Sequence, residues 1–180
     1  MTIVGDNNRD PQKRRNPMPS DPAKTPSTGQ CFVSSRQGLA PSLTTVGFYE
    51  EIEHTADLAL KCGGPDLDSF FRSAAMGMYH LMGIGKTRPD GTLTQTVALE
   101  AMDMESLLVD WLGELAYLAE TQNLMFGTIR FQTLSATRIE AVLTGCRVSH
   151  IEKVIKAVTY HNLTIQKTHE GYAATVVFDV

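Results

Sequence analysis

Residues 57–85 have the sequence DLALKCGGPDLDSFFRSAAMGMYHLMGIG, in which an alternating hydrophobic pattern gives way to a helical one. The alternating part predicts a strand that ends at Gly63-Gly64-Pro65, because glycine and proline interrupt regular structure. From Leu67 to Met82 the apolar residues recur at helical spacing, and either Asp66 or Asp68 supplies the N-cap. This stretch therefore predicts a strand followed directly by an amphipathic helix.

The same two periods continue through the rest of the chain. Asp103 precedes a second helical pattern over 106–121, whose leucines and Trp111 share one side, while acidic residues occupy the other. The order of the segments predicts an α+β fold, in which two helices pack on an antiparallel or mixed β-sheet within a single domain. The segment 154–160 is apolar but ambiguous, and the expected strands cover 47–53, 57–62, 93–101, 126–134, 138–148, 163–167 and 172–178.

The composition is that of a soluble globular protein, with 42% hydrophobic and 20% charged residues among 180. No apolar run reaches the roughly 18 residues that a transmembrane helix needs, so no membrane partner is expected. The net charge of −4 argues against strong nucleic-acid binding on a broad basic surface. Three cysteines without ligand spacing exclude a disulfide scaffold and a thiolate zinc site, and they favour the reducing cytoplasm.

The average composition conceals two unlike parts. Residues 1–45 hold six of the eight prolines and have six basic and three acidic residues, a net charge of +3. Such a segment buries too little apolar surface to offset its ordering entropy, so we expect a disordered N-terminal extension. Its prolines and aspartates fit an organellar transit peptide poorly. Residues 46–180 have ten basic and seventeen acidic residues, a net charge of −7, and form the expected compact domain.

The motifs of common hydrolases are missing from the sequence. There is no glycine-rich phosphate loop, no Gly-x-Ser-x-Gly segment and no His-Glu-x-x-His segment. Two polar segments are nevertheless unusual, since Asp179 follows four core-like residues and Asp57 lies between two strand-like runs. Asp179 and the α-carboxylate of Val180 offer hard oxygen ligands, and Asp57 as a third would complete a calcium or magnesium site. In the alternative, Asp57 caps a turn and Asp179 is merely exposed.

Five segments together resemble one family. The segment Glu53-His54-Thr55-Ala56-Asp57 resembles the first signature of the archease family, Lys156-Ala157-Val158-Thr159-Tyr160-His161 the second, and Val177-Phe178-Asp179-Val180 the third. Residues 73–78 and 107–112, in the two expected helices, also fit. The resemblance covers about residues 47–180 in the family's order, and five blocks in register are far more specific than one motif.

The resemblance implies a function and a site. Archeases are non-catalytic cofactor proteins that activate the RtcB-type tRNA-splicing RNA ligase, promoting its guanylylation and multiple turnover. Their fold is an α+β sandwich, and their metal site matches Asp57, Asp179 and Val180 of this chain. Calcium is the expected ion, with magnesium as the alternative. His54, Lys156 and His161 are candidates for orienting a ligand or contacting the partner.

Two other classes of function stay open at this point. A carboxylate-bound Mg²⁺ with His54 or His161 nearby could activate water in a phosphoester hydrolase. A general chaperone or adaptor module with a structural calcium ion is the third class, and its client binding would not depend on Asp57.

Overall fold

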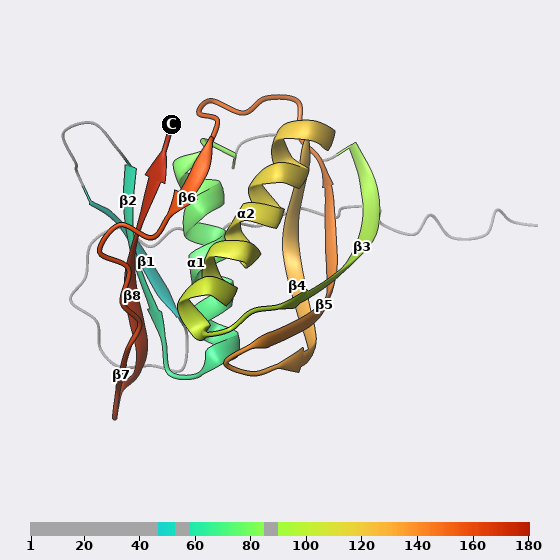
Figure 1. The fold of residues 1–180 in the computed structure, drawn as a ribbon. Coiled ribbons are helices and arrows are strands. Elements are labelled where there is room, and N and C mark those ends of the chain that lie inside the picture. Colours follow the sequence, from blue (N-terminus) through green and yellow to red (C-terminus); the bar gives the residue numbers. More distant parts are fainter. Residues whose placement is uncertain (1–46, 53–57, 85–89) are drawn as a thin grey trace, which may run out of the picture.

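The two helices lie between two antiparallel sheets in the computed structural model, which describes residues 47–52, 58–84 and 90–180 (Figure 1). The elements in chain order are β1 (Phe48–Ile52), β2 (Leu58–Gly64), α1 (Leu67–Leu81), β3 (Asp90–Glu100), α2 (Met104–Gln122), β4 (Leu124–Leu134), β5 (Arg138–Arg147), β6 (Ala157–Thr159), β7 (Gln166–Thr168) and β8 (Gly171–Asp179).

The larger sheet has five strands, in the order β1-β2-β8-β6, with β7 also pairing β8. Strand β8 lies at its centre, because β2 pairs along one edge and β6 and β7 pair along the other. The short β6 lies opposite the end of β8, whereas β7 forms a hairpin with its beginning. The strands expected over 163–167 and 172–178 correspond to β7 and β8 and form this hairpin, in which Gly171 has a positive φ of 121°.

The smaller sheet has three strands in the order β3-β5-β4, and β5 lies in the middle. Alternate residues of β5 are buried against the helices, as Ile139, Ala141 and Leu143 show. The remaining face of this sheet points away from the helices. This alternation is the period of two that the sequence displays.

The core forms where the two helices meet both sheets. Helix α1 is buried on most of its surface, including Phe70, Phe71 and Met78, and α2 contributes Trp111 and its leucines. The indole N–H of Trp111 donates to the backbone oxygen of Phe71 at 3.3 Å, so the largest side chain also ties the two helices together. A helix covered on both sides accounts for the broad apolar surface of α1.

Both predicted helices and the α+β class are confirmed, and the structure settles two open points. Asp66, not Asp68, is the N-cap of α1, since its carboxylate accepts the Ser69 N–H at 2.8 Å. Asp68 instead forms an ion pair with Arg72 one turn later, at 2.6 Å. The strands divide into two antiparallel sheets, which the sequence pattern did not separate.

The ambiguous segment 154–160 contains the three-residue strand β6. The predicted disordered extension, residues 1–45, lies outside the described residues and stays a prediction. Within the described ranges, no helix has the length and hydrophobicity to cross a membrane.

Asp66→Ala should lower the free energy of unfolding at pH 7 by about 1 kcal/mol, because the Ser69 N–H loses its capping partner. Asp66→Asn is the matched control and should stay close to wild type, since asparagine caps helices about as well. Urea denaturation measures both changes. Equal losses in the two variants would contradict the capping role.

The same cap predicts a pH dependence. The hydrogen bond from the Ser69 N–H lowers the pKa of Asp66. The ionised Asp66 carboxylate therefore contributes its full share of the folding stability above the unfolded pKa of about 3.9. This stabilisation is lost as the pH falls through the lower pKa of the folded state. The stability difference between wild type and Asp66→Ala should accordingly narrow in denaturation experiments below about pH 4.

Candidate functional site

The end of β8 brings two of the signature segments side by side. Strand β6 runs antiparallel to β8, so that Ala157 lies opposite Asp179 and Thr159 opposite Val177. The Thr159 hydroxyl also donates to the Val177 oxygen at 3.0 Å. Phe178 is fully buried and Asp179 is exposed, so the boundary between core and solvent falls between these two residues.

Lys156 makes two hydrogen bonds to the end of β8. Its backbone N–H donates to the Asp179 oxygen at 2.9 Å, and its side-chain Nζ donates to the main-chain oxygen of Val180 at 2.8 Å. The structure therefore places Lys156, a candidate from the sequence, directly beside two of the three predicted metal ligands. All three residues are exposed, and Val180 keeps 36% of its surface accessible.

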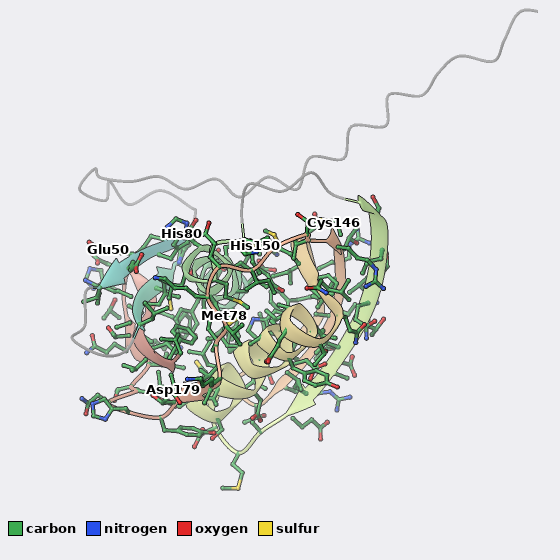
Figure 2. The ribbon with its side chains drawn as sticks, turned by 90° about the horizontal axis from the view of Figure 1, so that it is seen from above. Glu50, Met78, His80, Cys146, His150 and Asp179 are labelled. Atoms are coloured by element: carbon green, nitrogen blue, oxygen red, sulfur yellow. The ribbon has the colours of Figure 1, made fainter. Side chains whose placement is uncertain are left out.

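The oxygen donors at this position suit a hard cation. Asp179 offers an exposed carboxylate and Val180 a main-chain oxygen beside it, and such donors are those that Ca²⁺ and Mg²⁺ prefer. Figure 2 shows Asp179 on the side of the larger sheet, apart from Cys146 on the smaller one. The described ranges contain no group of three or more His, Cys, Asp or Glu side chains that could hold a metal ion. The donor set is therefore compatible with a cation but needs a further ligand.

Two of the predicted residues, Asp57 and His54, lie outside the described residues. The residue bonded to Asp57 is Leu58, which pairs with Phe178 across β2 and β8. Phe178 is in turn bonded to Asp179. The chain neighbours of two predicted ligands, Asp57 and Asp179, are thus partners in the sheet.

His161 lies in the turn after β6. The Leu163 N–H donates to the Tyr160 oxygen at 3.2 Å, and Asn162 has a positive φ of 53°. The His161 ring lies 3.0 Å from the Asn162 side-chain nitrogen, and its backbone N–H donates to the Thr159 hydroxyl. The hydrogen bonds of His161 are thus to Thr159 and Asn162, and among the described residues none joins it to Asp179 or Val180.

Glu105 makes a long-range hydrogen bond that the sequence did not predict. It lies on the acidic side of α2, yet its carboxylate accepts the backbone N–H of Ile165 at 3.0 Å and is only half-exposed. Asp110 and Glu120, on the same helix, are exposed as expected. Acidic residues are common in the first turn of any helix, so nothing in the local pattern distinguishes Glu105. Its hydrogen bond anchors the segment that follows the second signature to α2.

The chain is similar to the proteins of one known family. A model of the Archease protein family (MTH1598/TM1083) matches residues 49–180. The chain belongs to the archease family. The archease of Methanosarcina acetivorans is 39% identical over 140 residues, which are 73% of this chain and 95% of that protein. The archease of Archaeoglobus fulgidus is 34% identical over 140 residues, 73% of this chain and 98% of that protein.

Solved structures show the same fold. Protein 1598 of Methanobacterium thermoautotrophicum aligns with a TM-score of 0.55 at 25% identity, over 73% of this chain and 98% of that one. The Thermotoga maritima archease, described as a possible chaperone, aligns with a TM-score of 0.54 at 23% identity, over 73% and 96% of the two chains. The archease-type α+β sandwich expected from the signatures is therefore confirmed.

Glu105→Ala should speed hydrogen exchange at the Ile165 amide, because the N–H loses its acceptor. Glu105→Gln should leave that amide protected, since the amide oxygen of glutamine also accepts a hydrogen bond. NMR exchange rates measure the effect, and Glu114→Ala, a change on the same helix, is the control. Similar exchange at Ile165 in all three variants would show that the contact does not hold this segment.

Proposed function

We propose that this protein activates an RtcB-type RNA ligase by promoting its guanylylation and multiple turnover, and that it acts through the acidic end of β8. The observation that carries the proposal is the meeting of signature segments there. Lys156 of the second contacts Asp179 and Val180 of the third, and Leu58, which follows the first, pairs with Phe178. Membership of the archease family supports the same function.

In this proposal Asp57, Asp179 and the terminal carboxylate of Val180 hold a calcium ion, with magnesium as the alternative. The bound cation would neutralise carboxylates that otherwise repel one another. Lys156 holds the main-chain oxygen of Val180 and so orients the last residue of the chain. His54 remains a proposed supporting residue for Asp57.

Activation requires only that the protein bind one state of the ligase better than another. A differential affinity of about 1–3 kcal/mol is enough to shift such an equilibrium substantially. Residues 46–180 have ten basic and seventeen acidic residues, and this negative charge complements a partner with a basic RNA-binding face. The exposed end of β8 is accessible to a protein of that kind.

Asp57→Ala and Asp179→Ala should each abolish stimulation of multiple-turnover RNA ligation by the cognate ligase, because each removes a proposed ligand. Asp110→Ala, which removes an exposed carboxylate from α2, is the matched control and should stimulate normally. Urea denaturation should show unchanged stability for Asp179→Ala. Normal stimulation by both ligand variants would refute the role of this site.

The same experiment separates the competing functions. No joined RNA should form when the ligase is omitted. The protein alone should also release no phosphate from nucleotides in the presence of Ca²⁺ or Mg²⁺. Metal-dependent turnover by the protein alone would instead support a phosphoester hydrolase. Binding of unfolded clients that survives Asp57→Ala would support a general chaperone.

One glycine added after Val180 should weaken calcium binding, because it converts the terminal carboxylate into a neutral amide. The same glycine added before Met1 is the control and should leave binding unchanged. Isothermal titration with CaCl₂ measures both. Equal affinities would mean that the terminal carboxylate is not a ligand, while the roles of Asp57 and Asp179 would remain to be decided by the ligation experiment.

A further inference from the structure

Strand β3 presents one long edge without a strand partner among the described residues. It lies at the margin of the smaller sheet, with β5 on its inner side (Figure 1). Its register with β5 is continuous from Leu93 to Glu100. No described strand pairs with the backbone N–H and C=O groups along the other edge, and groups of this kind can pair with a strand from another chain.

The chemistry of this edge favours such pairing. Residues 91–99, GTLTQTVAL, contain no charge and no proline, and they are rich in β-branched residues. The first charge that follows, Glu100, forms an ion pair with Arg138 of β5 at 2.7 Å. Between Leu93 and Glu100 the edge has no lysine, proline or register shift of the kind that prevents strands from associating, although its register with β5 shifts between Asp90 and Leu93.

The other edge strands of the described structure carry those protective features. Strand β1 has five residues, two of which are Glu50 and Glu51, and β6 and β7 have three residues each. Strand β4 is long, but its register with β5 shifts twice and it carries Arg130. Strand β3 therefore differs from every other described edge.

The charge distribution favours a second copy of this chain as the partner. The compact domain, residues 46–180, has seven more acidic than basic residues, so most of its surface repels another copy. The smaller sheet is an exception, since its strands carry equal numbers of acidic and basic residues, namely Asp90, Glu100, Glu140, Arg130, Arg138 and Arg147. Two copies that meet at β3 thus approach through a neutral region.

We propose that two copies of this chain associate by antiparallel pairing of β3 with β3, around a two-fold axis at Thr96. This register joins two three-stranded sheets into one of six strands. It places Thr96 opposite Thr96 of the second copy, and Leu93 opposite Leu99. Leu93 and Leu99 are both only partly buried against the core, and pairing covers them further.

The pleat of the sheet restricts the register. Leu93, Val97 and Leu99 face the helices, whereas Thr94 and Thr96 are exposed on the outer face. A shift by one residue would put Leu99 of one copy opposite Thr92 or Thr94 of the other, both of which are exposed on the outer face. Centring the pair at Thr96 keeps both apolar faces on the same side and opposes no like charges.

Thr96→Lys tests the proposal, because it places two ammonium groups opposite each other at the two-fold axis. Thr128→Lys is the matched control, since Thr128 is exposed on the same sheet but lies on its other edge strand, β4. Sedimentation equilibrium of the full chain should show a dimer for wild type and for Thr128→Lys. Thr96→Lys should raise the dissociation constant by roughly five-fold or more, since like charges directly opposite each other oppose strand pairing.

A cross-linking variant checks the register independently of folding changes. Thr96→Cys in a Cys31→Ser background should be joined into a covalent dimer by a short bis-maleimide, whereas Thr128→Cys should not. The remaining cysteines, Cys62 and Cys146, are buried, and burial raises the pKa of the Cys62 thiol to about 12, so it is unreactive.

Three outcomes would overturn the proposal. A wild-type chain that is monomeric at all micromolar concentrations has no such interface. A dimer that Thr96→Lys and Thr128→Lys weaken equally associates through another surface. A monomer whose stimulation of the ligase is lost only in Thr96→Lys would assign this edge to the ligase instead.

Discussion

The pairing of β8 along both of its edges is the constraint on which the rest of the larger sheet depends. It pairs with β2 along one edge, and on the other edge it pairs with β7 at its beginning and with β6 at its end, so much of its buried backbone has the hydrogen-bond partners that it requires. Val176, Val177 and Phe178 are buried in succession, so the strand is held by side chains as well as by the ladder. Residues near a chain end usually fray. Here the ladder continues to Asp179, which therefore projects from a rigid support.

The contact between α1 and β2 fixes the other side of this support. Gly77 of α1 faces Leu60 of β2, and a Cβ at Gly77 would lie 2.7 Å from the leucine methyl groups. The buried Ser73 hydroxyl lies 2.9 Å from the backbone oxygens of Gly63 and Phe70, which ties the helix to the end of the strand. Because β2 pairs with β8, this close packing also supports the ladder in which Leu58 lies opposite Phe178. The candidate site therefore lies at the end of a strand pair that α1 holds in place.

The helices and strands could be predicted from the sequence, whereas the contacts between segments far apart in the chain could not. Helix starts were predictable because Asp66 and Asp103 cap them, and the helical period follows at once. The division of the strands between two sheets was not, since period-two patterns do not specify a partner. Glu105 escaped for the same reason, because its acceptor role depends on Ile165, a residue 60 positions away.

The candidate site divides in the same way. Asp179 and Val180 are neighbours in the sequence, so their oxygens could be recognised as a pair from the residues alone. Lys156 became a candidate only through the resemblance to the archease family. Its contacts with Asp179 and Val180 follow from the pairing of β6 with β8. An exposed hydrogen bond between a lysine and a main-chain oxygen contributes little to stability, because water competes for both groups. Its consequence is positional, because Lys156 contacts Val180 next to a strand that the core has already made rigid, and a proposed ligand binds better when its position is fixed in advance.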